Sequence, residues 1–524
     1  MRPQFRQALL LLFVATWASL CATLSLIGGC GGFAAPLGVT TGGVKDMAYA
    51  RQTIEDGGIP DPGAITVEGF VSEHGIDVPA PHDAGALYST TSVAWNPDFD
   101  ELTPLITVQV GFGSNIDPDE FERTALNLCL VIDRSGSMND AFDERTRTSK
   151  IDAVRIAIDR LLAQLNAQDR VSVVMFAEEA AVLLDPVPGN DVSAVKVALD
   201  ELTVRGNTDL AEGLRRAYRL VEANRHASRF DRLMVFTDAQ ITAGLRRSDE
   251  LIDVMEEFAA DGIGATIVGV GTDFGQDLAA DIAQVRGGNV VYLNDYERIV
   301  QVFDEEFDFL VSPIAYDVRL AAVIPFALDV ADTHGLRDSD PTGHTLEMLI
   351  PSLFYSNKPG GAAIFIRLRP GALVDFGEPI EAATLSLSYK TTNGQSITES
   401  ATAVLPAGQD PQAQKRYFQT DSTQRAVLLL NTALALKNAS RDAYMGYTDD
   451  DATGEQGYQY PSIEDYLRAI DRLTEFLPYF DQLADGLEDR PSPQSRALSQ
   501  ERALVQKLLD NIRARSDFAG IDGF

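Results

Sequence analysis

Five oxygen-bearing side chains occur in three short segments that lie far apart in the sequence. Asp133, Ser135 and Ser137 stand at alternate positions of the first segment, Thr208 lies in the second, and Asp238 lies in the third. Carboxylate and hydroxyl oxygens are hard donors, which suit Mg²⁺, Ca²⁺ or Mn²⁺ better than Zn²⁺. If the fold brings the three segments together, these residues form a site for a divalent cation.

The part of the chain that contains these segments alternates between apolar runs and amphipathic helices. The strand-like runs are Leu126 to Ile132, Val171 to Phe176, Leu233 to Thr237, Ala265 to Val270 and Val290 to Leu293. The clearest helix has one apolar face between Ile151 and Leu165. This alternation predicts a doubly wound parallel sheet with helices on both sides. Because ligands of such sheets bind at the carboxyl ends of the strands, Asp133, Thr208 and Asp238 are expected at one edge.

In these motifs the sequence resembles the von Willebrand factor A family. Asp133, Ser135 and Ser137 match its Asp-x-Ser-x-Ser motif, Thr208 matches its threonine, and Asp238 matches its second aspartate. The resemblance implies a Rossmann-like domain with a metal-ion-dependent adhesion site, where the two serines and the threonine contact the ion. The two aspartates would lie close by, often through water. The last coordination position would be left for an Asp or Glu carboxylate of a protein partner.

Two positions depart from the family pattern. Ala239 stands where glycine often follows the second aspartate, and Asn207 stands where a second glycine often precedes the threonine. Neither change removes a ligand, so only the geometry of the site is put in question. Asp209 is expected to act as a first-turn helix residue rather than as a sixth ligand.

The regions on either side of the α/β domain follow other patterns. Strand-like runs are Leu105 to Val110, Val318 to Val323, Thr345 to Ile350, Ala363 to Arg369 and Thr384 to Tyr389. The later ones predict an antiparallel, β-sandwich-like region. Helical stripes cover about Ser422 to Asn438, the stretch after Ser462, and about Ser499 to Arg513. Whether the strands before Leu126 complete the same sandwich, with the α/β domain inserted in it, stays open.

These patterns divide the chain into six expected segments. They are a lipoprotein signal peptide (1–29), a flexible tether (30–45), an N-terminal segment with strands (46–124), the α/β domain (125–312), a β-rich domain (313–408) and a C-terminal helical domain (409–524). The stretch from Tyr49 to Phe70 looks like the N-terminal region of a bacterial family of lipoproteins with such A domains.

The first residues indicate export and lipid anchoring. Arg2 and Arg6 precede an apolar run, and the run ends in Leu26-Ile27-Gly28-Gly29-Cys30, which resembles the lipobox of bacterial lipoproteins. Cys30 is then the lipidated residue, and the protein is expected in the bacterial cell envelope. Gly31 follows it without an aspartate, which points to the outer membrane if the organism is Gram-negative. The alternative is an uncleaved transmembrane anchor, because about 20 apolar residues can span a bilayer.

Composition and missing motifs exclude several functions. The formal net charge of −34, from 77 acidic and 43 basic side chains, repels phosphate backbones, so nucleic-acid binding is not expected. The chain has no Gly-x-x-x-x-Gly-Lys loop for nucleotide and no His-Glu-x-x-His motif for catalytic zinc. Once Cys21 is removed and Cys30 is lipidated, Cys129 alone remains, as an inert buried thiol.

These observations lead to three functional hypotheses. The first is an envelope-anchored adhesion protein, not an enzyme, whose cation joins Ser135, Ser137 and Thr208 to an acidic group on a protein partner. The second is a passive envelope scaffold that binds through its β or helical regions. The third is a metal-dependent hydrolase, for which no nearby residue supplies a convincing base.

Overall fold

The computed structural model describes most of the chain beyond residue 37. The described residues are 38–41, 47–74, 76, 78, 87–97, 99, 104–117, 121–142, 147–238, 245–271, 282, 285–334, 344–356, 363–409, 415–450, 455–489 and 496–519. The predicted signal peptide (1–29) and the predicted lipidation site Cys30 lie outside them. No helix in the described part is both long enough and apolar enough to cross a bilayer.

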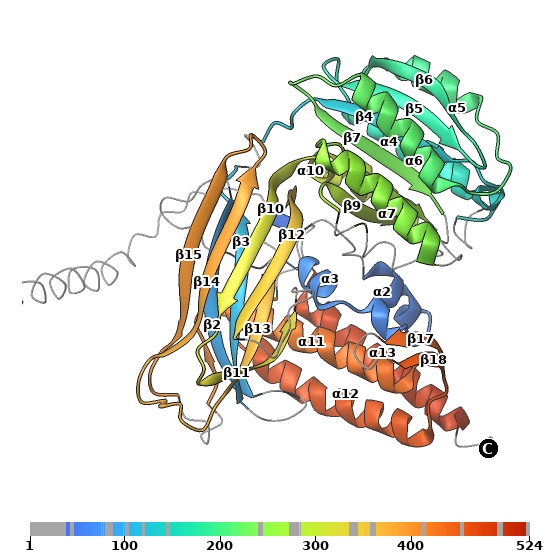
Figure 1. The fold of residues 1–524 in the computed structure, drawn as a ribbon. Helices are drawn as coiled ribbons and strands as arrows, with labels where there is room; N and C mark the ends of the chain where they lie inside the picture. The colour runs from blue at the N-terminus through green and yellow to red at the C-terminus, as the bar shows by residue number, and fades with distance from the viewer. Residues whose placement is uncertain are drawn as a thin grey trace, which may run out of the picture. The chain divides into compact units, whose positions relative to one another are not determined.

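The α/β domain contains a six-stranded sheet in the order β6-β5-β4-β7-β8-β9 (Figure 1). Its strands are β4 (Leu126–Asp133), β5 (Arg170–Phe176), β6 (Ala180–Pro188), β7 (Phe230–Thr237), β8 (Gly264–Val270) and β9 (Gly288–Leu293). All neighbours pair in parallel except β6, which runs antiparallel to β5. The five predicted strands are confirmed, and β6 was not predicted.

Helices cover both faces of this sheet, as the alternation of elements predicts. They are η3 (Gly136–Asn139), α4 (Lys150–Gln164), α5 (Val192–Asp200), α6 (Leu210–Ala223), α7 (Leu245–Ala260), α9 (Tyr296–Val300), the π-helical η4 (Gln301–Glu306) and α10 (Phe307–Leu310). Leu128 and Leu130 of β4 pack with α4, α5 and α9 to α10, whereas Cys129 and Val131 pack with α6 and α7. Burial raises the pKa of the Cys129 thiol to about 12, in keeping with an inert side chain.

A second sheet has ten strands, which come from the segments before and after the α/β domain in the sequence. They are β1 (Gly38–Thr41), β2 (Leu87–Pro97), β3 (Pro104–Ser114), β10 (Pro313–Val323), β11 (Leu328–His334), β12 (Thr345–Ser356), β13 (Ala363–Pro370), β14 (Ile380–Thr391), β15 (Ser396–Leu405) and β16 (Tyr417–Phe418). Because β3 pairs with β13 from Ala363↔Gly111 to Leu368↔Ile106, the α/β domain is inserted between β3 and β10. Apolar side chains from eight of these strands form one core.

One strand of this sheet falls inside the predicted flexible tether of residues 30–45. Residues Gly38–Thr41 form β1, which pairs antiparallel with β12 and reaches β3 through Gly38↔Gly113. This part of the segment is therefore sheet rather than linker. The Gly- and Thr-rich composition suggested a tether, but backbone hydrogen bonding in a sheet needs no large apolar side chain.

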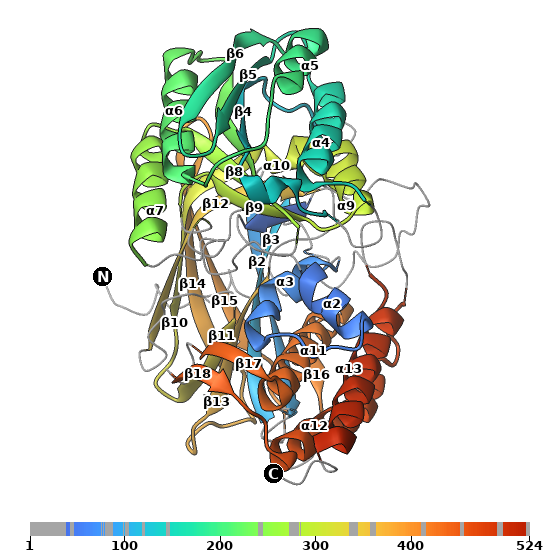
Figure 2. The ribbon, with the colours of Figure 1, turned by 90° about the vertical axis from the view of Figure 1, so that its right-hand side faces the viewer.

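The C-terminal helices and the N-terminal helices share a third core (Figure 2). The elements are α2 (Ala48–Glu55), η1 (Pro62–Ala64), α3 (Val67–Ser72), α11 (Asp421–Ala443), α12 (Ile463–Ala484) and α13 (Leu498–Ala519), with a hairpin of β17 (Gly446–Asp450) and β18 (Glu455–Gln459). The predicted segment 46–124 is thus divided: its helices belong to the helical core, and its strands belong to the ten-stranded sheet.

A buried ion network joins the N-terminal helices to α13. Arg51 donates to both carboxylate oxygens of Glu501 at 2.8 and 3.0 Å and also pairs with Glu73. His74 Nε2 lies 3.3 Å from the same carboxylate, which has no exposed surface. Burial alone would raise the pKa of Glu501, but the hydrogen bonds and charges of His74 and Arg51 outweigh it and hold the pKa at about 2.

We expect Glu501→Gln to lower the free energy of unfolding by about 3 kcal/mol at neutral pH, because Arg51 and His74 lose a buried charged partner. The pKa of Glu501 is lower in the folded chain, so its contribution is complete above about 4.5 and disappears as the pH falls toward about 2. The difference in melting temperature between variant and wild type should therefore shrink in acid. A difference that stays constant across this pH range would contradict the assignment.

Candidate functional site

Asp133 ends β4 and is fully buried at the carboxyl edge of the six-stranded sheet. Its Oδ1 accepts a hydrogen bond from the backbone N–H of Ser135 at 2.8 Å, and its Oδ2 accepts one from the Thr237 hydroxyl at 2.6 Å. Burial raises the pKa of Asp133, although the hydrogen bonds from Thr237 and Ser135 work in the opposite direction. The carboxylate is thus held in one orientation at the start of the loop that carries the two serines.

The two serines and Asp238 form a continuous chain of hydrogen bonds at this edge. The hydroxyl of Ser137 donates to Asp238 Oδ1 at 2.9 Å, and the hydroxyls of Ser135 and Ser137 lie 3.2 Å apart. Because Ser137 gives its proton to Asp238, Ser135 is the donor between the two serines. Residues 105 positions apart in the sequence, Asp133 and Asp238, are thus brought to one site, as the motif spacing predicts.

The loop that carries Thr208 is joined to the serine loop by backbone hydrogen bonds. The N–H of Gly136 donates to the carbonyl of Gly206 at 3.0 Å, and the N–H of Arg205 donates to the carbonyl of Arg134 at 2.7 Å. Gly206 has a φ of +88°, a conformation that residues with a Cβ rarely adopt. Asp209 caps helix α6 by accepting from the N–H of Glu212, which confirms its predicted helix role.

A lysine that was not predicted from the sequence also lies at this site, next to Asp238. Lys150 is the first residue of α4, and its ammonium donates to Asp238 Oδ2 at 2.8 Å. The lysine and aspartate side chains are 5% and 2% exposed, so this is a buried ion pair. A cation at a helix N-terminus opposes the helix dipole. That unfavourable placement, directly after the cap Ser149, is the sequence signal that could have identified Lys150.

The donors at this edge suit a hard cation. Neutral hydroxyls come from Ser135 and Ser137, with Thr208 in the adjoining loop, and negative charge comes from Asp133 and Asp238. No group of three or more His, Cys, Asp or Glu side chains suited to a metal occurs among the described residues, so any cation here would depend on the hydroxyls. The predicted departure at Ala239 lies outside the described residues, whereas Asn207 donates to the Glu178 carboxylate at 2.9 Å.

The buried pair gives a test that needs no ligand. Asp238→Asn should lower the free energy of unfolding by about 3 kcal/mol, because it leaves the Lys150 ammonium buried without its charged partner. Lys150→Met in the same chain should restore much of that loss, giving a large coupling energy in the double-mutant cycle. Additive effects of the two changes, measured by denaturant unfolding, would show that the pair does not form.

Comparison with known proteins supports a specific domain type. The family model for the von Willebrand factor type A domain matches residues 128–240. Two curated relatives are each 25% identical: uncharacterized protein YfbK of Escherichia coli over 294 residues, and uncharacterized protein sll0103 of Synechocystis over 220 residues. These matches cover 54% and 40% of this chain, and 48% and 50% of the relatives. The chain thus spans about half the length of the curated relatives it matches.

Solved structures with similar folds include a von Willebrand factor type A protein from Catenulispora acidiphila. It is 16% identical with a TM-score of 0.47, and the match covers 82% of this chain and 97% of that one. The ArnB paralog VWA2 from Sulfolobus acidocaldarius is 13% identical with a TM-score of 0.37, covering 82% and 99%. The stretch matched by the family model begins in β4 and extends just past β7, so it includes all five predicted site residues. The inserted α/β domain of this chain is therefore a von Willebrand factor type A domain.

Proposed function

We propose that this protein is a binding and adhesion protein of the bacterial cell envelope, anchored by a lipid on Cys30. Its von Willebrand factor type A domain would hold Mg²⁺, Ca²⁺ or Mn²⁺ through Ser135, Ser137 and Thr208, with Asp133 and Asp238 nearby. The ion would take an Asp or Glu carboxylate from a protein partner. The observation that carries the proposal is the hydrogen-bonded chain from Asp133 through both serines to Asp238.

The charges at the site support an acidic ligand. Asp133 and Asp238 each carry a formal charge of −1 and Lys150 carries +1, so these three side chains sum to −1. A divalent cation would bring the sum to +1. Lys150 therefore weakens attraction for the cation itself but leaves the loaded site with a positive charge. An incoming carboxylate neutralises that charge in a setting where little water screens it.

The same features favour binding over catalysis. The two serine hydroxyls are engaged in hydrogen bonds that end on Asp238, and the basic side chain of Lys150 is paired with the same carboxylate. A nucleophile activated by a neighbouring base is thus not formed by these residues. We assign the edge to recognition of a partner rather than to chemistry on a substrate.

Asp133→Ala is expected to abolish cation binding and cation-dependent capture of the partner. The change removes the carboxylate that orients the serine loop, so the hydroxyls lose their common geometry. Titration calorimetry with Mn²⁺ measures the first effect, and recovery of envelope proteins with Mg²⁺ or with chelator measures the second. Asp209→Ser is the matched control, because serine retains the cap of α6 and the loop keeps its other donors. Equal binding by Asp133→Ala and Asp209→Ser would contradict the proposal.

Lys150→Met should raise the affinity for the cation and lower the affinity for the protein partner. Removal of the ammonium 2.8 Å from Asp238 is expected to tighten Mn²⁺ binding by about tenfold, or about 1.4 kcal/mol. The loaded site then loses its net positive charge, so capture of the partner at saturating cation should weaken. Lys196→Met is the control, since that exposed lysine of α5 pairs with Asp159 away from the site. Unchanged cation affinity in Lys150→Met would show that the lysine does not influence the site.

A further inference from the structure

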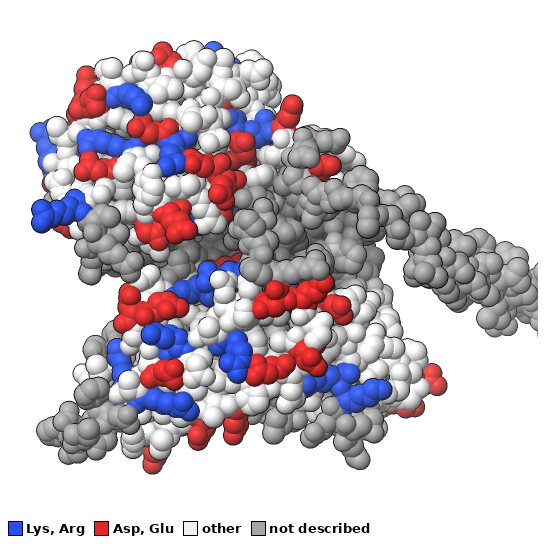
Figure 3. Space-filling model, turned by 180° about the vertical axis from the view of Figure 1, so that it is seen from behind, with Lys and Arg blue, Asp and Glu red and all other residues white. Residues whose placement is uncertain are grey.

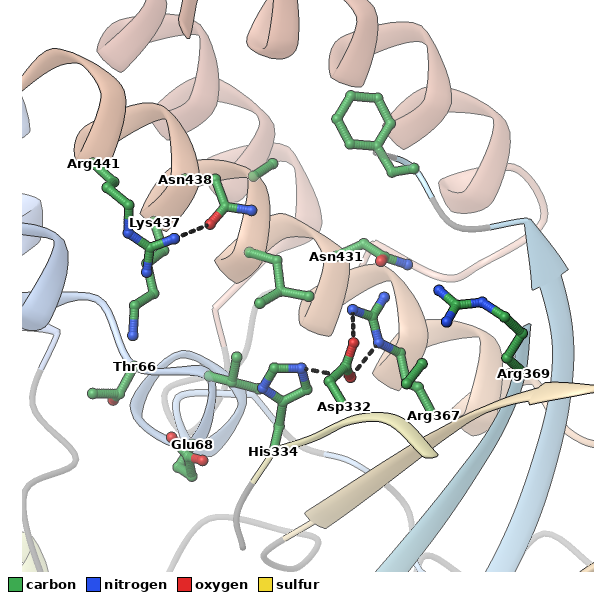
Figure 4. A pocket seen from close by; sticks show the side chains of 15 residues that line it. Thr66, Glu68, Asp332, His334, Arg367, Arg369, Asn431, Lys437, Asn438 and Arg441 are labelled. Atoms are coloured by element: carbon green, nitrogen blue, oxygen red, sulfur yellow. Dashed lines mark hydrogen bonds and ion pairs between the residues drawn. The ribbon is translucent and has the colours of Figure 1, made fainter. Parts of the chain in front are cut away.

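A cavity of about 490 Å³ lies outside the von Willebrand factor type A domain (Figure 4). One wall is α11, with Lys437 and Arg441, and the facing wall is formed by β11 and β13, with Asp332, Arg367 and Arg369. Residues at the start of α3 close a third side. The cavity is thus assembled from the N-terminal segment, the ten-stranded sheet and the C-terminal helices.

The lining is basic although the chain as a whole is strongly acidic. Among the described residues, four Lys or Arg side chains and two acidic ones, Glu68 and Asp332, line the cavity, whereas the chain has a net charge of −34. On the face drawn in Figure 3, in contrast, basic and acidic side chains are interspersed. A concave site focuses the field of its charges, so this concentration of cations attracts anions more strongly than the same residues on a flat surface.

One side of the cavity is held rigidly by a charged triad. Asp332 accepts hydrogen bonds from Nε and Nη2 of Arg367, and His334 Nε2 lies 3.1 Å from Asp332 Oδ1. Burial would raise the pKa of Asp332, but the hydrogen bonds from His334 and Arg367 hold it at about 2. Asp332 therefore stays ionised and fixes the Arg367 guanidinium in the wall. Beside this pair, the described lining has three more basic side chains, Arg369, Lys437 and Arg441, and one more acidic side chain, Glu68.

The opposite side presents cations one helical turn apart. Lys437 and Arg441 are four residues apart on α11, so their side chains lie on the same helix face, and Figure 4 shows both on the α11 side of the cavity. Arg441 donates to the side-chain oxygen of Asn438 at 3.1 Å, which restricts its guanidinium. Val67, Phe99 and Leu434 add apolar surface to the lining. The cavity combines charge for an acidic group with space and apolar contact for an organic part.

We propose that this cavity binds a small organic anion whose carboxylate or phosphate group lies between α11 and β13. Arginine forks and a lysine ammonium are the usual partners of both groups in proteins. A volume of about 490 Å³ exceeds what a bare inorganic ion needs and falls in the range of small-molecule sites. The site is separate from the cation site, so it neither needs nor blocks the adhesion function proposed above.

The test is titration calorimetry of the purified chain at constant ionic strength with citrate, glucose 6-phosphate and inorganic phosphate. At least one of the two organic anions should bind, and more tightly than inorganic phosphate; the tighter one identifies the carboxylate or the phosphate class. Lys437→Gln on α11 and Arg369→Gln on β13 should each weaken that binding by about tenfold. Asp133→Ala should leave it unchanged, which separates this proposal from the proposed cation site.

Lys507→Gln is the matched control, because Lys507 is another half-buried helical lysine, on α13, that does not line the cavity. Melting temperatures without anion show whether each variant is folded, and Arg369, which is exposed, gives a second variant if Lys437→Gln is unstable. The proposal is overturned if neither organic anion binds, if inorganic phosphate binds as tightly as both, or if Lys507→Gln weakens binding as much as Lys437→Gln.

Discussion

The carboxylates of Asp133 and Asp238 are buried at the ends of β4 and β7, and the positions of the other polar groups at the carboxyl edge depend on them. A buried charge is tolerated only when hydrogen bonds or an opposite charge compensate it. Asp133 is compensated by Thr237 and the backbone of Ser135, and Asp238 by Ser137 and Lys150. The helical and loop elements around the edge supply these partners, so the arrangement of the donors follows from the need to satisfy two acids.

The lysine gives this edge a property that the motif residues alone do not have. Without Lys150, a divalent cation and two carboxylates would balance, and an acidic partner would meet a neutral site. With the lysine, a site loaded with a divalent cation would carry an excess positive charge, whereas without the cation Lys150 is the counter-ion of Asp238. In the proposed site, one side chain on α4 would lower the affinity for the cation and raise the affinity for an acidic partner.

Much of the α/β domain could be predicted from the sequence because its strands are continuous apolar runs, and Asp133 and Asp238 stand at the carboxyl ends of two of them. Lys150 could not be found in this way, since it belongs to no ligand motif and is brought to Asp238 only by the packing of α4. The edge strand β6 was not predicted because most of its residues are half-buried and show no alternation. It also contains prolines, which a strand tolerates only at a sheet edge or a bulge. The short strand β1 escaped because its pairing depends on the backbone alone.

The insertion of one domain into the sheet of another has a mechanical consequence. The chain enters the α/β domain after β3 and leaves it through α10 into β10, so a force applied to this domain is transmitted through two connections. Arg123, in the entering connection, is paired with Asp308 of α10 at 2.6 Å and with Asp169. The two connections are thus joined by the Arg123–Asp308 ion pair where they meet the domain, and tension is divided between two strands of one hydrogen-bonded sheet. A force on the α/β domain is therefore resisted by two anchored ends of the chain rather than by one.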